Sequence, residues 1–237
     1  MADKRLIVAL DMHSMDKVKA LVTALGDSVS YYKVGMELFY SVGSSVIKYL
    51  RDADKEVFLD LKLHDIPNTV AHGLGSLSCL GASLLNVHAS GGFTMMQTAA
   101  AYLREQAAIN QIDRPKLIAV TVLTSMHQDD WDKLGMVIPM QEQVVRWAKL
   151  AQAAGLDGVV ASPLEAQAIR KACGNDFLIV TPGVRPSGVA VNDQSRIATP
   201  AGALKNGASH LVIGRPITAA ADPRAAALKI IEEMEDK

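Results

Sequence analysis

Eight short apolar runs, separated by longer stretches with helical periodicity, constrain the fold of this chain more than any other feature. The runs cover residues 6–10, 31–34, 57–61, 84–87, 117–122, 158–160, 177–180 and 210–213. The clearest helical stretches cover residues 15–25, 39–50, 141–154 and 163–172. Eight strands that alternate with helices predict an α/β fold, a (β/α)8 TIM barrel. An open, doubly wound sheet is the alternative, because alternation alone does not distinguish the two.

Length and composition fit one globular domain over residues 1–237. The chain is 49% hydrophobic and 21% charged, with a formal net charge of -1, which gives no electrostatic footprint for nucleic acid or an anionic membrane. The N-terminus lacks the apolar region of a signal peptide, and no apolar run approaches membrane-spanning length, so we expect a soluble, cytoplasmic protein. Its two cysteines, Cys79 and Cys173, are expected to be reduced thiols.

The segment from Asp60 to Thr69 carries the densest group of charges near a predicted strand end. A strand over residues 56–62 places Asp60 and Lys62 on the same face, because alternate side chains share a face. Pro67 is typical of a helix start, so Asp65 is expected in the loop between strand and helix. A surface ion pair at a frayed strand end is the alternative interpretation, since such pairs are common and weak.

Polar residues recur at the same end of strand after strand, where the working residues of a barrel lie. These residues lie at the end of a predicted strand or just after it: Asp11, Lys33, Asn86, His88, Thr124, Ser125, Arg185 and Arg215. In the last of these loops, Gly214 allows close approach of an anion and Arg215 offers a planar, permanently charged fork, which favours a phosphate site. The turn 183–185 and the polar run 187–195 together form a loop that is long enough to serve as a lid. A structural arginine bound to a neighbouring helix is the alternative.

Lys33, Asp60, Lys62 and Asp65 alternate amine and carboxylate, which keeps each group charged. Such an array suits a reaction that develops negative charge on carbon, because a fixed ammonium stabilises the carbanion and donates the proton that quenches it. We expect no metal, because the six histidines show no ligand spacing. His64 is two residues from Lys62 and could hold Lys62 in place without touching a ligand, although a hydrogen bond to backbone is the simpler role. His88 is interpreted as a packing residue. Nucleophile-elbow, Walker and dinucleotide motifs are also absent from the sequence.

The segment Asp60-Leu-Lys-Leu-His-Asp-Ile-Pro-Asn-Thr69 resembles the signature of the orotidine 5'-monophosphate decarboxylase family. Further blocks resemble the family in order along nearly the whole chain, namely residues 8–11, 32–35, 87–90, 123–125, 180–186 and 212–216. The spaced Asp-x-Lys-x-x-Asp is shared with a wider superfamily, whereas its continuation as Ile-Pro-Asn-Thr together with Lys33 is highly specific. Residues 126–140 match no part to which a role can be given.

The resemblance implies a TIM barrel that converts orotidine 5'-phosphate to UMP and CO2 without cofactor or metal. Lys62 would donate a proton to C6, held between Asp60 and Asp65. Lys33 and Asp11 would bind the ribose hydroxyls and extend the charged network.

The same resemblance implies a homodimer with shared active sites. Asp65, Ile66 and Thr69 would serve the site of the partner subunit. Thr124 and Ser125 fall where the family contacts the pyrimidine, and which of them does so stays open.

The remaining expected substrate-binding residues belong to the last two strand-end loops. Pro182 lies in the first of them, and Arg185, Gln194, Gly214 and Arg215 match the residues that close on the phosphate. Gln194 would bridge the phosphate and the base.

Two rival functions stay open from sequence. A relative in the same superfamily, a decarboxylase or aldolase of sugar phosphates, would use a metal and would carry a carboxylate where this chain has Lys33. A non-catalytic barrel that binds a phosphate ligand would not need Lys62 between two acids.

Overall fold

The computed structural model describes residues 2–186 and 198–235 and shows eight parallel strands in a closed barrel. Every neighbouring pair is parallel, and the barrel closes where β1 pairs with β8. The strands are β1 Leu6–Ala9, β2 Tyr31–Gly35, β3 Glu56–Leu63, β4 Leu84–His88, β5 Lys116–Val120, β6 Gly158–Val160, β7 Leu178–Thr181 and β8 His210–Ile213. Closure confirms the TIM barrel and rules out the doubly wound sheet.

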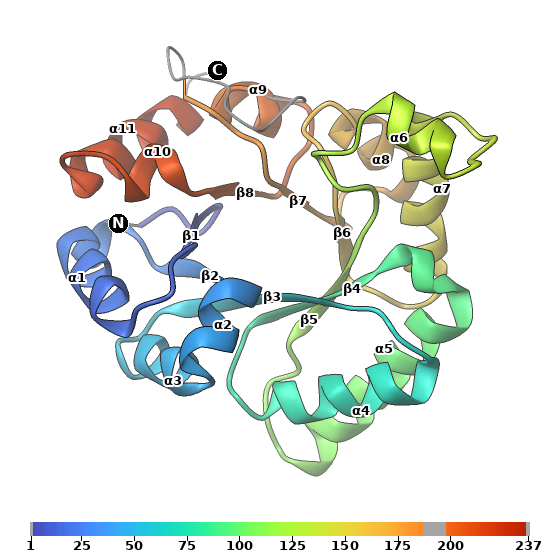
Figure 1. Cartoon of the computed structure of the whole chain (residues 1–237), viewed down its shortest axis with the longest axis horizontal. Coiled ribbons are helices and arrows are strands. Elements are labelled where there is room, and N and C mark those ends of the chain that lie inside the picture. The colour runs from blue at the N-terminus through green and yellow to red at the C-terminus, as the bar shows by residue number, and fades with distance from the viewer. Residues whose placement is uncertain (1, 187–197, 236–237) are drawn as a thin grey trace.

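The helices surround the barrel (Figure 1). They are α1 Met15–Leu25, α2 Met36–Val42, α3 Ser45–Asp52, α4 Pro67–Ser78, α5 Gly92–Ile109, α6 Gln128–Lys133, α7 Met140–Ala153, α8 Ala166–Cys173, α9 Pro200–Lys205, α10 Arg215–Thr218 and α11 Pro223–Glu235, with 3-10 turns η1 Gly26–Ser28 and η2 Ala89–Gly91. In the described part of the chain no helix is both long and apolar enough to cross a membrane. Cys79 and Cys173 are both free thiols.

One expected helix is divided. The periodicity over 39–50 predicts a single helix, but α2 ends at Val42 and α3 begins at Ser45. Gly43 between them has φ +69°, a left-handed conformation that stops an α-helix and that glycine adopts without a steric penalty. The apolar periodicity continues across the break, because both helices bury the same face against the barrel.

The core has two layers. One layer lies between strands and helices, and the other fills the barrel with strand residues such as Ile7, Tyr31, Phe58, Leu84 and Val180. Because alternate side chains of a strand share a face, the residues two positions further along β2, β3 and β4 continue the inner layer toward the carboxyl ends of the strands. Those next positions are polar: they are Lys33, Asp60 and Asn86.

Strand β3 is irregular where it reaches this polar layer. Its pairing with β4 runs Leu59↔Leu85 and then Leu63↔Val87, so three residues of β3 face the single residue Asn86. Lys62 within this bulge has φ +53°, a left-handed conformation that costs a non-glycine residue roughly 1–2 kcal/mol. A β-bulge re-aims the side chains that follow it.

Candidate functional site

Four charged side chains meet at the carboxyl ends of the first three strands. The ammonium of Lys62 lies 2.7 Å from Asp60 Oδ1, and that of Lys33 lies 3.5 Å from Asp60 Oδ2. Lys33 also donates a hydrogen bond of 2.9 Å to Asp11 Oδ1, just beyond β1. The sequence-based prediction that Asp60 and Lys62 face the same way is confirmed, although the bulge interrupts regular alternation between them.

Burial and charge act in opposite directions on this network. Asp60 is only 7% exposed, and burial alone would raise its pKa, but the positive charges of Lys33 and Lys62 and hydrogen bonds hold that pKa below its usual value. Burial would likewise lower the pKa of Lys33, but the carboxylates of Asp60 and Asp11 raise it above its usual value. Both groups are therefore charged at neutral pH, as expected for mutually compensating ions.

A cavity of about 190 Å³ opens directly onto the network. Lys33, Asp60 and Lys62 form its charged side, and apolar residues of the inner barrel layer, such as Val120 and Val160, form the opposite side. Pro182, after β7, also lines it. A cavity with a charged end and an apolar wall suits a flat, partly apolar ligand whose reacting group meets the charges.

Thr124 and Ser125 are neighbours in sequence but differ in environment. Thr124 lines the cavity beside Lys62, whereas Ser125 is exposed and lines a separate depression with Met126 and residues of the α6 region. The structure therefore brings Thr124, and not Ser125, to the charged network.

The segment between β3 and α4 turns away from the cavity. Asp65, Ile66 and Thr69 are exposed, and Ile66 is 67% exposed. The Asp65 carboxylate accepts a hydrogen bond of 2.6 Å from the backbone N–H of Ile66. Asp65, Ile66 and Thr69, all of which the structure describes, do not line the cavity. Pro67 begins α4 at the expected position.

The residues expected at a phosphate are placed around the ends of β7 and β8. Arg185 is 7% exposed, and its Nη1 donates a hydrogen bond of 2.9 Å to the carbonyl of Val184. Gly214 precedes α10, and a Cβ built on it would lie 3.5 Å from the Asp11 carboxylate. Arg215 begins α10 and is exposed. Gln194 and the expected lid 187–195 lie outside the described residues.

Asn86 is a strand-end residue to which the sequence alone assigns no role, and it lies within the charged network. It is fully buried, its Nδ2 donates a hydrogen bond of 2.6 Å to Asp60 Oδ1, and its Oδ1 accepts one of 2.8 Å from the backbone N–H of Lys62. The available signal was an amide inside the apolar run 84–87, because a buried polar side chain needs partners.

Two histidines lie next to the network. The ring centroids of His64 and His88 are 5.4 Å apart, and the ring planes are tilted by 39°. Burial, together with the proximity of His64 and Lys62, lowers the pKa of His88, which keeps its ring neutral at pH 7.

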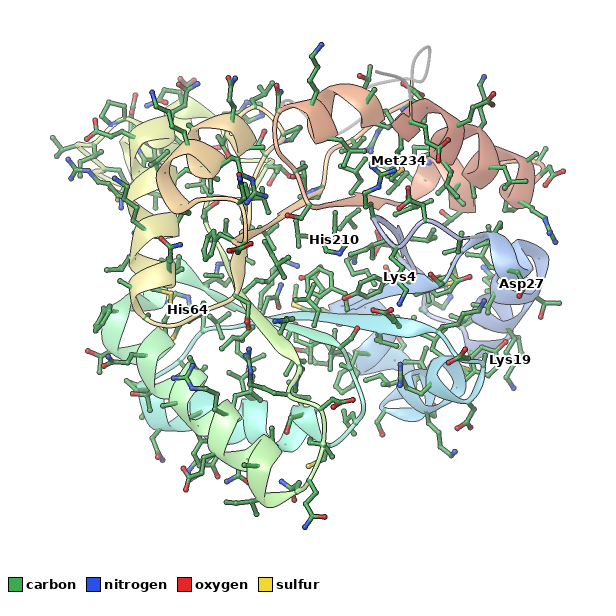
Figure 2. The ribbon with its side chains drawn as sticks, turned by 180° about the vertical axis from the view of Figure 1, so that it is seen from behind. Lys4, Lys19, Asp27, His64, His210 and Met234 are labelled. Carbon is green, nitrogen blue, oxygen red and sulfur yellow. The ribbon has the colours of Figure 1, made fainter. Side chains whose placement is uncertain are left out.

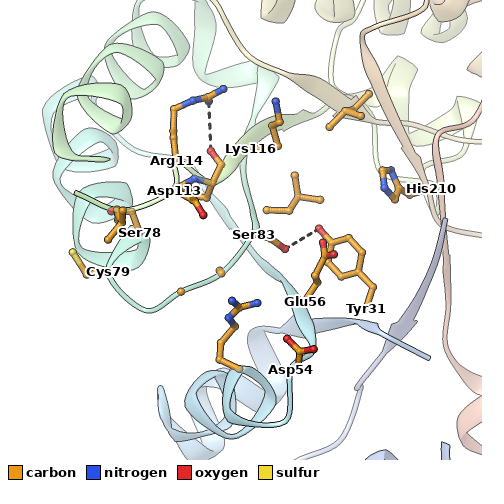
Figure 3. A pocket seen from close by; sticks show the side chains of 17 residues that line it. Tyr31, Asp54, Glu56, Ser78, Cys79, Ser83, Asp113, Arg114, Lys116 and His210 are labelled. Atoms are coloured by element: carbon orange, nitrogen blue, oxygen red, sulfur yellow. Dashed lines mark hydrogen bonds between the residues drawn. The ribbon is translucent and has the colours of Figure 1, made fainter. Parts of the chain in front are cut away.

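A larger cavity of about 780 Å³ lies at the other end of the barrel, where the strands begin (Figure 3). Several of its polar groups bind one another or nearby protein groups: Tyr31 and Ser83 are 3.2 Å apart, and Arg114 makes two hydrogen bonds, of 2.8 and 2.7 Å, to Asp157. His210 also lines this cavity. It lies toward the middle of the molecule, whereas Lys19 and Asp27 lie at the margin of the molecule (Figure 2). The strand carboxyl ends, which carry the function of such barrels, are at the smaller cavity.

Within residues 2–186 and 198–235, no group of three or more histidine, cysteine, aspartate or glutamate side chains is arranged to hold a metal ion. The ammonium of Lys33 contacts the carboxylates of both Asp11 and Asp60.

The chain is similar over its whole length to proteins of known name. A model of the "Orotidine 5'-phosphate decarboxylase / HUMPS family" matches residues 4–230. Orotidine 5'-phosphate decarboxylase of Trichlorobacter lovleyi is 52% identical over 98% of this chain and 96% of that protein, and the one of Moorella thermoacetica is 52% identical over 99% and 93%. The crystal structure of orotidine 5'-phosphate decarboxylase from Lactobacillus acidophilus has a TM-score of 0.87 at 43% identity, over 99% of this chain and all of that one.

The buried network predicts a pH-dependent stability effect for Asp60→Asn. Because the pKa of Asp60 is lowered on folding, its ionised form stabilises the fold above the usual value of 3.8, and this contribution is lost as the pH falls below that value. We expect Asp60→Asn to lower the free energy of unfolding by about 3 kcal/mol at pH 7, since it leaves buried ammonium groups without their shared carboxylate. Urea unfolding at pH 7 and pH 3 measures the difference in the free energy of unfolding between wild type and Asp60→Asn. This difference should be smaller at pH 3.

The matched control is Asp52→Asn, which removes the carboxylate of an exposed pair with Lys48. An exposed pair contributes at most about 1 kcal/mol, so this variant should unfold almost as the wild type does. Equal, pH-independent effects of the two substitutions would contradict the assignment of Asp60 as the stabilising centre.

Proposed function

The chain belongs to the orotidine 5'-phosphate decarboxylase / HUMPS family, and we propose that it decarboxylates orotidine 5'-phosphate to UMP and CO2 with Lys62 as the proton donor. The observation that carries the proposed mechanism is the 2.7 Å contact between the Lys62 ammonium and the buried Asp60 carboxylate at the cavity's charged side. An ammonium fixed in this way stabilises negative charge that develops nearby, without having to reorient during the reaction.

In the proposed reaction the bond between C6 and the carboxylate carbon breaks, and its electron pair stays on C6. The Lys62 ammonium stabilises this carbanion and then transfers a proton to it, which yields UMP and a neutral amine that regains a proton from solvent. Asp60 holds the ammonium in place, and its charge also repels a substrate carboxylate. We rank that repulsion below transition-state stabilisation, because ground-state destabilisation is contested.

The ribose is proposed to bind at the outer part of the network. Lys33 and Asp11 form a donor and acceptor pair 2.9 Å apart beside the cavity, a suitable partner for neighbouring hydroxyl groups. Thr124 lines the same cavity and is the better candidate of the two neighbouring hydroxyls to bind the pyrimidine.

The phosphate is proposed to bind where the loops after β7 and β8 meet. Arg185 and Arg215 offer planar cations there, and Gly214 brings backbone next to Asp11 at the edge of the network. Pro182 lines the cavity between these loops and Lys62. Gln194 keeps its proposed role as a bridge between phosphate and base.

The position of Lys33 separates this proposal from the metal-dependent rival. Divalent cations in such sites need oxygen ligands that converge. Here a buried ammonium lies between Asp11 and Asp60, at 2.9 and 3.5 Å, so a cation would meet a positive charge. A barrel that only binds a phosphate ligand would gain nothing from the buried Lys62 and Asp60 pair, whose desolvation is costly.

A homodimer with shared sites is proposed from the segment after β3. Asp65, Ile66 and Thr69 are exposed in the single chain, Ile66 to 67%, so all three are accessible to a partner subunit. Across a two-fold interface Asp65 would approach the Lys62 of the partner subunit and complete the alternating charges.

The test of the proposed activity is the loss of orotidine 5'-phosphate absorbance in the presence of excess chelator. We expect full turnover, because the proposed residues supply both charge stabilisation and the proton. Absence of turnover would refute the proposed function, and turnover that the chelator removes would favour the metal-dependent rival.

Lys62→Ala is expected to reduce kcat by at least about 10³-fold, since both the fixed charge and the proton donor are lost. Binding of UMP, measured by calorimetry, should persist because the phosphate residues are untouched. Lys48→Ala, which removes an exposed lysine of α3, is the control and should be fully active. More than a few per cent of wild-type activity in Lys62→Ala would disprove its role as proton donor.

Mixing inactive Lys62→Ala and Asp65→Ala subunits tests the shared site. Each heterodimer would regain one intact site, so an equal mixture should recover about a quarter of wild-type activity if subunits exchange freely. A mixture of Lys62→Ala with Asp60→Ala is the control, because both residues belong to the same half of a site and neither site is restored. Equal recovery in both mixtures, or none in either, would contradict the shared site.

A further inference from the structure

The Asn86 side chain spans the irregular part of β3 with two short hydrogen bonds. Its Nδ2 donates to Asp60 Oδ1 at 2.6 Å, and its Oδ1 accepts from the Lys62 backbone N–H at 2.8 Å. Asn86 is fully buried in β4 and faces the barrel interior. One side chain thus contacts both the carboxylate and the lysine of the proposed catalytic pair.

The bulge explains why a side chain is needed at this point. Between Leu59↔Leu85 and Leu63↔Val87 the regular ladder is interrupted, and Asn86 alone lies opposite residues 60–62. The Lys62 N–H therefore bonds to a side chain, and Lys62 itself holds φ +53°. A non-glycine residue stays in this conformation only when its surroundings over-determine it.

We propose that Asn86 is a positioning residue that fixes the Lys62 and Asp60 pair in its reactive arrangement, an inference that rests on the proposed function. Its acceptor holds the lysine backbone in the left-handed conformation that aims the side chain at the cavity. Its donor fixes the rotation of the Asp60 carboxylate.

The carboxylate contacts show what that rotation decides. Asp60 Oδ1 accepts hydrogen bonds from Asn86 Nδ2, at 2.6 Å, and from the Lys62 ammonium, at 2.7 Å. The other oxygen, Oδ2, lies 3.5 Å from the Lys33 ammonium. A carboxylate that turned would exchange these partners and weaken the short contact with Lys62. The amide donor therefore determines which oxygen anchors the proton donor.

Side chains of similar size that are apolar or ionised do not supply both the donor and the acceptor. Leucine fills the space and bonds to neither partner, and alanine removes the side chain. Ionised aspartate accepts from Lys62 but cannot donate to Asp60, whereas protonated aspartate can do both. These differences separate a positioning role from simple packing.

The first arm of the experiment compares Asn86→Leu and Asn86→Ala with wild type. We expect kcat to fall about 100-fold or more in both, because small displacements of reacting groups have effects of this size, while the Kd for UMP changes less than about threefold. Ser83→Ala is the matched control: Ser83 lies directly before β4 at its opposite end and bonds to Tyr31 and to the Val57 carbonyl. Ser83→Ala should keep wild-type kcat.

The second arm follows kcat of Asn86→Asp against pH. Two carboxylates at hydrogen-bond distance raise the pKa of one of them, and the protonated form restores the missing donor. We therefore expect activity of Asn86→Asp to rise as the pH falls, and wild type to show no such rise. The other titratable groups that face this site, namely Asp11, Lys33, Lys62 and His88, are common to both enzymes.

A crystal structure of Asn86→Ala completes the test, and it does not depend on activity. Lys62 should leave the left-handed region. Retained φ near +53°, a kcat within about threefold of wild type in folded Asn86→Leu or Asn86→Ala, or parallel losses of activity and UMP binding would each overturn the inference. So would an Asn86→Asp profile that matches wild type. Inactive wild type would instead refute the proposed function, and the crystal structure alone would then decide the inference.

Discussion

The buried carboxylate of Asp60 is the interaction on which the rest of the site depends. It accepts hydrogen bonds from Lys62 and Asn86 and lies beside Lys33, so one group joins side chains of β2, β3 and β4. A carboxylate that is 7% exposed is costly to bury without such partners. The two ammonium groups offset that cost, and the carboxylate in turn raises the pKa of Lys33 and so favours its charged form. Stability and the proposed chemistry therefore depend on the same contacts, because removing any one charge leaves another uncompensated.

The strand pattern was sufficient to predict eight strands that alternate with helices, because runs such as 84–87 and 210–213 are short and apolar and are separated by helical stretches. The pattern favoured the barrel but did not exclude an open sheet, because closure depends on the pairing of β1 with β8, the first and last strands. The break at Gly43 also escaped prediction, since the apolar periodicity continues on both sides of it. Local patterns report which face is buried, and contacts between distant segments decide the rest.

The same limit applies to the site. Asp60 and Lys62 were predictable as one group because both come from one strand end, and Lys33 because barrel strands end together. The role of Asn86 was not, since it depends on the register between β3 and β4, which shifts at this point. Thr124 and Ser125 could not be separated from sequence either, because adjacent residues of a loop can face entirely different surroundings.

The bulge in β3 connects the catalytic half of the site to the proposed subunit contact. A regular strand would carry its alternation through residue 62 and continue in the barrel wall. With Lys62 in the left-handed conformation, the strand pairs once more, at Leu63↔Val87, and the chain then leaves the barrel and exposes Asp65 and Ile66. Lys62 thus lines the cavity, whereas Asp65 is exposed on the surface where we propose that a partner subunit binds. In the proposed shared site, residues only three positions apart serve different sites. That arrangement would account for the many charges of so short a segment and for the buried amide that holds its geometry.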